Sequence, residues 1–190
     1  FGTLGQVIEQ VSEDGTRKRL YKLDDGSLIE SVLMPYNDGR RTACISSQAG
    51  CAMGCTFCAT GQMGFKRHLS AEEIFEQAQR YSVELQQQGE RLSNIVLMGM
   101  GEPFHNYDAV LEAIGLLRTR LGIGARKITV STVGIVPKIR QFAKEGIQVG
   151  LAISLHSTLN TERSAMMPVN RKYPIEDLID ACHEYVEATN

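Results

Sequence analysis

The stretch TACISSQAGCAMGCTFC, residues 42–58, joins a short apolar segment to a glycine-rich loop that contains three cysteines. The apolar segment at 42–47 has the composition of a β-strand, and three more such segments follow at 94–99, 127–133 and 149–155. Their nearly continuous apolar character is typical of strands that are buried on both faces, as in parallel sheets.

Amphipathic helices are predicted between and after these strands. Ser70 followed by Glu73 forms a capping box, which predicts that a helix over 71–87 begins there. Further helices are predicted roughly over residues 107–121, 135–145 and 175–188. The alternation of strands and helices predicts an α/β fold, a sheet or barrel built from right-handed crossovers.

The first 41 residues follow a different pattern. Short strand-like runs at 7–11, 19–23 and 28–34 are separated by the turn signals EDG and DDG. We therefore expect two parts: a small antiparallel β meander with a linker over residues 1–41, which packs on the α/β part formed by residues 42–190.

The composition of the chain excludes some classes of protein. The chain has 190 residues with 20 basic and 22 acidic side chains, which excludes a polybasic tail but leaves room for a local nucleic-acid-binding patch. No apolar run reaches the ~18 residues that a membrane span requires, and no signal peptide is visible. We therefore expect a cytoplasmic protein without a membrane partner. Because the first residue is Phe1, we also expect the chain to be cut from a longer one.

Cys51, Cys55 and Cys58 have the spacing CxxxCxxC. Clustered thiolates are soft ligands for iron–sulfur clusters or zinc. Three cysteines on a four-iron cluster leave one iron free for a small-molecule ligand. A zinc site would need a fourth ligand, for which His68 is the nearest candidate. Three unrelated buried cysteines are the remaining interpretation, which the spacing and the neighbouring glycines disfavour.

The other chemically distinctive residues follow the later predicted strands. Gly101 and Glu102 lie in the segment GMGEP, Ser131 lies at the end of the third strand, and Ser154 and His156 lie at the end of the fourth. Ligands of α/β folds bind at the carboxyl ends of strands, so these loops point to one shared site. Each residue also has an ordinary interpretation, such as a solvated Glu in a tight turn.

Several blocks of the sequence resemble the RlmN/Cfr family of RNA methyltransferases, within the radical S-adenosylmethionine (SAM) superfamily, and RlmN more than Cfr. The blocks are SSQAGC at 46–51, MGMGEP at 98–103, STVGIVP at 131–137, AISLH at 152–156 and PVNRKYPIE at 168–176. The resemblance implies a partial (βα) barrel of the radical-SAM type with about four βα units.

The resemblance also assigns roles to individual residues. It implies that the three clustered cysteines hold a 4Fe–4S cluster and that Glu30 is a general base. Cys44, which is otherwise expected to be a buried structural residue, would resolve a covalent adduct between protein and RNA. The implied SAM-binding residues are Gly101, Glu102, Ser131, Ser154, Leu155 and His156.

The implied activity is methylation of carbon-2 of adenine, in ribosomal RNA at the peptidyl-transferase centre and in tRNA beside the anticodon. The reaction uses two SAM molecules per turnover and an electron from a flavodoxin-like reductase. The enzyme is expected to be a monomer. The methyl-carrying cysteine of the family lies far toward the C-terminus, and Cys182 does not match it. We therefore expect a fragment that lacks the N-terminal accessory domain and the last part of the barrel. It would bind cluster and SAM without transferring the methyl group.

Three alternatives remain open at this level. One is a zinc-stabilised RNA-binding module without catalysis. Another is a Cfr-like enzyme that methylates carbon-8. The third is a radical SAM enzyme that acts on a small molecule.

Overall fold

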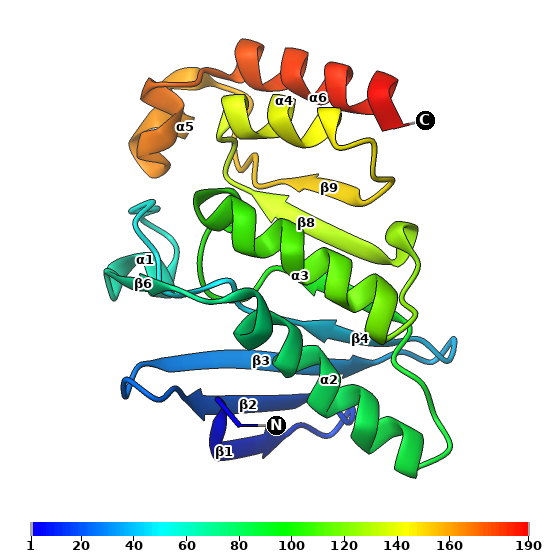
Figure 1. Ribbon diagram of the computed structural model, residues 1–190. Coiled ribbons are helices and arrows are strands. Elements are labelled where there is room, and N and C mark those ends of the chain that lie inside the picture. Colours follow the sequence, from blue (N-terminus) through cyan, green and yellow to red (C-terminus); the bar gives the residue numbers. More distant parts are fainter. Residues whose placement is uncertain (1, 190) are drawn as a thin grey trace.

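The computed structural model describes residues 2–189 and contains one seven-stranded mixed sheet with helices packed on one face (Figure 1). The strand order is β1-β2-β3-β4-β7-β8-β9. Strand β4 (Arg41–Cys44) runs parallel to β7 (Asn94–Leu97), followed by β8 (Ile128–Thr132) and β9 (Gly150–Ile153). Because each parallel strand lies beside its predecessor in the chain, the order is that of a barrel wall, without the reversal of a doubly wound sheet.

The predicted helices form the layer over this sheet. They are α2 (Ala71–Gln87), α3 (Tyr107–Arg120), α4 (Val136–Lys144) and α6 (Ile175–Thr189). The core between the layers is apolar, and Cys182 on α6 packs against it as expected. The predicted α/β fold with about four parallel strand–helix units is therefore confirmed.

The antiparallel meander is formed by β1 (Gly5–Val11), β2 (Arg17–Lys22) and β3 (Leu28–Pro35). Gly15 and Gly26, in the predicted turns, have the positive φ angles that such turns require. Strand β3 pairs antiparallel with β4, so the meander continues the sheet edge to edge.

Two short strands and two short α-helices were not predicted from the sequence. Strands β5 (Gln48–Gly50) and β6 (Phe65–His68) form a hairpin around the cysteines, and α1 (Ala59–Gln62) lies within its loop. Helix α5 (Asn160–Met166) follows β9. Figure 1 shows the cysteine hairpin and α5 projecting from the same end of the sheet, at the left of the view.

Candidate functional site

A cavity of about 310 Å³ lies at the carboxyl ends of the parallel strands. It brings together the loop after β4, the loop after β7 and the ends of β8 and β9, as the sequence predicted. Its lining residues are Cys51, Met53, Cys55, Phe57, Cys58, Thr60, Gly61, Leu97, Met98, Gly99, Gly101, Glu102, Ser131, Thr132, Val133 and Ser154.

The cysteine loop is folded back tightly at its base. Gly50 has φ +76°, and a Cβ atom there would lie 1.9 Å from the carbonyl oxygen of Gly64. That same oxygen accepts a hydrogen bond of 3.1 Å from the amide of Cys51. Glycine at position 50 therefore allows the two ends of the loop to close directly before the first cysteine.

All three cysteines of the motif are free thiols on the cavity wall, with Cys51 and Cys55 buried and Cys58 half-buried. Burial, together with the nearby Cys51, Cys58 and Glu102, raises the pKa of Cys55 to about 11. Burial also raises the pKa of Cys51. Thiolates are thus disfavoured here unless a cation compensates their charge. Within residues 2–189, no three His, Cys, Asp or Glu side chains converge on one point as ligands of a single ion.

Glu102 is 2% exposed and connects two loops of the cavity. Its Oε1 accepts a hydrogen bond of 3.0 Å from the amide of Phe104, and its Oε2 accepts one of 2.8 Å from the amide of Val133. Burial raises the pKa of Glu102 to about 6, although the hydroxyl of Thr132 and these two amides act in the opposite direction. The carboxylate is therefore held rigidly at the cavity rather than solvated in a turn.

The remaining predicted ligand residues divide into two groups. Ser131 and Ser154 line the cavity with their hydroxyl oxygens 3.5 Å apart. Leu155 and His156 are not among the lining residues, and His156 is exposed. The His156 ring lies against Phe57 of the cysteine loop, with ring centroids 4.1 Å apart, and its φ of 58° is the only positive φ of a non-glycine residue among residues 2–189.

Glu30 and Cys44 lie on the sheet face opposite the helices. Cys44 pairs with Val32 in the β3–β4 ladder, and Glu30 is two residues from Val32, so both side chains share one face. Burial raises the pKa of Cys44. The Glu30 carboxylate lies 2.7 Å from the ammonium group of Lys18.

Two buried polar residues near the cavity were missed by sequence reasoning. The amide oxygen of Gln48 accepts a hydrogen bond of 2.8 Å from the Glu102 amide, and its nitrogen contacts the Nδ1 atoms of His68 and His105 at 2.9 and 3.1 Å. Arg163 on α5 is fully buried. Gln48 falls in the quoted block at 46–51, whereas α5 carried no signal in the sequence.

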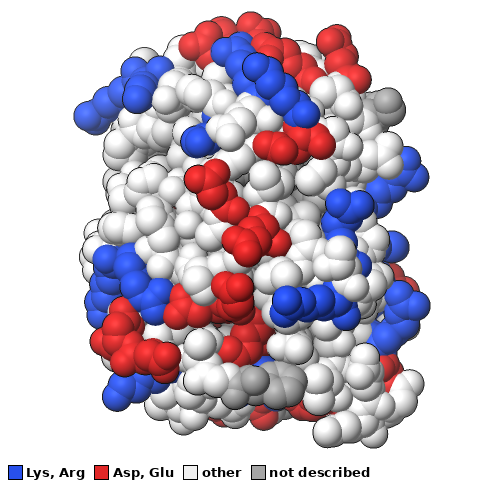
Figure 2. All heavy atoms as spheres, viewed as in Figure 1, with Lys and Arg blue, Asp and Glu red and all other residues white. Residues whose placement is uncertain are grey.

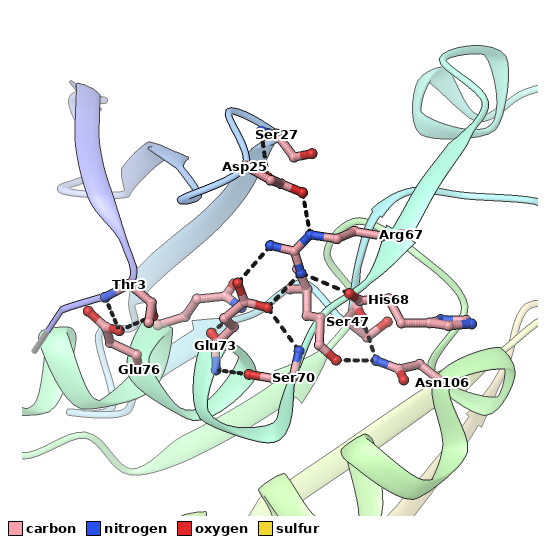
Figure 3. A network of polar contacts seen from close by, with 12 residues as sticks. Thr3, Asp25, Ser27, Ser47, Arg67, His68, Ser70, Glu73, Glu76 and Asn106 are labelled. Carbon is pink, nitrogen blue, oxygen red and sulfur yellow. Dashed lines mark hydrogen bonds and ion pairs between the residues drawn. The ribbon is translucent and has the colours of Figure 1, made fainter.

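Several arginines that could contact phosphates are already paired with carboxylates. Arg67 binds Asp25 and Glu73, in the network shown in Figure 3, while Arg40 pairs with Asp38 and Arg41 pairs with a further carboxylate. On the face shown in Figure 2, basic and acidic side chains are intermixed rather than gathered into a basic patch. Arg40, Arg41 and Arg67 are therefore better interpreted as paired surface residues than as phosphate contacts.

Comparison with known proteins places this site in a family. The model of the radical SAM superfamily matches residues 45–190. A curated relative from Desulfitobacterium hafniense strain Y51, named probable dual-specificity RNA methyltransferase RlmN, is 51% identical over 98% of this chain and 55% of its own length. The dual-specificity RNA methyltransferase RlmN 1 of Myxococcus xanthus is 51% identical over 98% of this chain and 53% of its own length.

A solved structure agrees with these matches. The crystal structure of a radical SAM methyltransferase from Sphaerobacter thermophilus superposes with a TM-score of 0.94 at 48% identity, covering 98% of this chain and 55% of that one. The chain therefore belongs to the radical SAM superfamily. The resemblance to the RlmN/Cfr family is confirmed by these relatives, and the chain spans about half the length of those it matches. Within residues 2–189, no helix combines the length and apolar character that crossing a membrane requires.

Proposed function

We propose that this chain is the cluster- and SAM-binding part of an RNA methyltransferase that methylates carbon-2 of adenine in ribosomal RNA and tRNA. The observation that carries the proposal is the shared cavity: Cys51, Cys55 and Cys58 line it together with Glu102 at the carboxyl ends of the parallel strands. The names of the similar proteins supply the RNA methyltransferase class, and the sequence blocks supply the adenine specificity.

The donor set suits a 4Fe–4S cluster. Three irons of such a cluster would each take one cysteine, and all three cysteines line one cavity. A single tetrahedral zinc would need a fourth protein ligand beside them. Cys51, Cys55 and Cys58 would hold the cluster, which supplies the electron for reductive cleavage of SAM. A flavodoxin-like reductase would deliver that electron.

The residues of the protein supply binding and proton chemistry. Glu102 and the Gly101 backbone would receive the amino group of SAM, and the hydroxyls of Ser131 and Ser154 would bind its other polar groups. Leu155 and His156 stay predictions, because neither lines the cavity.

Glu30 as general base and Cys44 as resolving thiol also stay predictions. Their common position on the face opposite the helices supports a substrate that approaches from that side. We further propose that the enzyme is a cytoplasmic monomer.

The cluster is tested by anaerobic reconstitution of the chain with iron and sulfide. We expect a brown protein with absorbance near ~400 nm from charge transfer between thiolate and iron. Cys55→Ser should lose most of this absorbance and most of the bound iron, whereas Cys182→Ser, a free cysteine in α6, should keep both. A colourless protein that binds stoichiometric zinc would instead identify the zinc-stabilised RNA-binding module.

The methyl transfer is tested separately. None of the five cysteines occupies the family's methyl-carrying position, so we expect the 190 residues alone to bind SAM but not to methylate ribosomal RNA. Incorporation of label from methyl-labelled SAM into adenine of ribosomal RNA would contradict this expectation.

A further inference from the structure

Arg163 on α5 is the largest fully buried side chain within residues 2–189, with no exposed surface. Its Nε donates to the carbonyl of Leu155 at 3.1 Å, and its Nη2 donates to the carbonyls of Val133 at 2.5 Å and Ser154 at 3.3 Å. Its Nη1 donates to Oδ1 of Asn170 at 2.6 Å. The planar guanidinium thus ties together the chain segments that follow β8 and β9.

All four acceptors are neutral. None of the ion pairs within residues 2–189 includes Arg163, although most other buried or half-buried arginines in the chain face a carboxylate. A buried cation without a countercharge is costly, and buried charges in proteins are usually paired or bind a metal centre. The unpaired charge of Arg163 therefore calls for an anion close by.

The cysteine loop lies next to this cation. The amide of Thr56, directly after Cys55, donates to the carbonyl of Met166 at 3.0 Å, so α5 is attached to the loop. Val133 and Ser154, whose carbonyls bind Arg163, line the same cavity as Cys55. Burial lowers the pKa of Arg163, and the charge of Cys55 opposes that change, which agrees with the proximity of the two groups.

We propose that Arg163 is a positioning residue that supplies the buried countercharge to the three-cysteine centre and fixes the ends of β8 and β9 against it. The inference rests on the proposed function, because the anion it requires is a cluster held by three thiolates. Reduction adds a further negative charge to such a cluster, so a nearby fixed cation stabilises the reduced form and raises its reduction potential.

The test is a potentiometric titration of the reconstituted chain, followed by electron paramagnetic resonance. Arg163→Met removes the charge, Arg163→Lys keeps the charge without the planar fork, and Arg140→Met removes an exposed, paired charge on α4 as a control. We expect Arg163→Met to lower the ratio of reduced to oxidised cluster at least about tenfold at a fixed potential, equivalent to about 59 mV for one electron. Arg163→Lys and Arg140→Met should stay close to the wild type.

The outcomes separate a charge effect from a structural one. An unchanged potential in Arg163→Met, or an equal shift in Arg163→Lys, would overturn the inference while leaving the proposed function intact. If Arg163→Met does not fold or retain iron, Arg163→Gln takes its place. Loss of the cluster in both neutral variants, with retention in Arg163→Lys, supports the countercharge, and loss in all three overturns it. A wild-type chain that takes up no iron contradicts the proposed function and the inference together.

Discussion

At the scale of single residues, the protonation state of Glu102 can be tested directly by experiment. Burial raises its pKa from 4.5 to about 6 in the folded protein. The folded state therefore holds this proton more tightly than the unfolded state. Its contribution to stability is fully present below pH 4.5 and is lost as the pH rises through about 6.

This effect predicts a pH-dependent difference between the wild type and Glu102→Gln. The gap between the two pKa values corresponds to about 2 kcal/mol. The free energy of unfolding of the wild type, minus that of the variant, should fall by about this amount between pH 4.5 and about pH 7. Urea denaturation across this range measures it, with Glu187→Gln at an exposed position of α6 as the control. A difference that does not change with pH would show that the carboxyl is not desolvated.

At the scale of elements, the N-terminus of α2 is fastened to its neighbours by a charge network (Figure 3). Ser70 and Glu73 form the predicted capping box, and Glu73 also binds both terminal nitrogens of Arg67 on β6, at 2.7 and 2.8 Å. Arg67 reaches on to Asp25 at 2.6 Å, in the turn between β2 and β3. One arginine thus links the cysteine hairpin, the helix and the meander.

We expect Arg67 and Glu73 to be energetically coupled. In a double-mutant cycle with Arg67→Ala and Glu73→Ala, the coupling free energy should be about 1 kcal/mol, because the Glu73 side chain is 10% exposed and the pair is bidentate. The exposed pair Arg140–Glu184 provides the matched cycle and should give a smaller value. Equal coupling in the two cycles, measured by urea denaturation, would contradict this.

The elements also show what the sequence could and could not predict. Helix α2 was predicted with its correct ends, because the capping box at Ser70 is a local signal. Helix α5 and the β5–β6 hairpin are too short to show a periodic pattern, so they were missed. The cysteines and Glu102 stood out by residue type and spacing. Gln48 and Arg163 did not, because burial of a polar side chain depends on partners that are distant in the sequence.

At the scale of the whole molecule, the meander and the parallel sheet share one helix. Helix α2 contacts the N-terminal part through Thr3 and Glu76, with oxygens 2.6 Å apart, and through the buried hydroxyls of Ser31 and Tyr81, 3.0 Å apart. Glu84 on the same helix pairs with an arginine of β2. The sequence pattern of residues 1–41 differs from that of the rest of the chain. We nevertheless propose that residues 1–41 do not unfold independently of residues 42–190.

Hydrogen exchange can check this cooperativity. Amides of the β2–β3 ladder and of the β7–β8 ladder should exchange with the same opening free energy, within about 0.5 kcal/mol. Removing the hydroxyl contact with Tyr81→Phe should lower both values together, whereas Val186→Ala, at an exposed site of α6, should change neither. Separate opening of the meander would show that it is an autonomous unit.

The pairing of β4 with β7 has a consequence for the order of assembly. Thr42 lies opposite Asn94, so the cysteine hairpin and α2 are both contained in the chain that this parallel pairing must close. Closing so long a segment is slow compared with forming the neighbouring hairpins of the meander. The walls of the cavity therefore come together late during folding, and metal loading should be a step that follows collapse of the sheet rather than one that nucleates it.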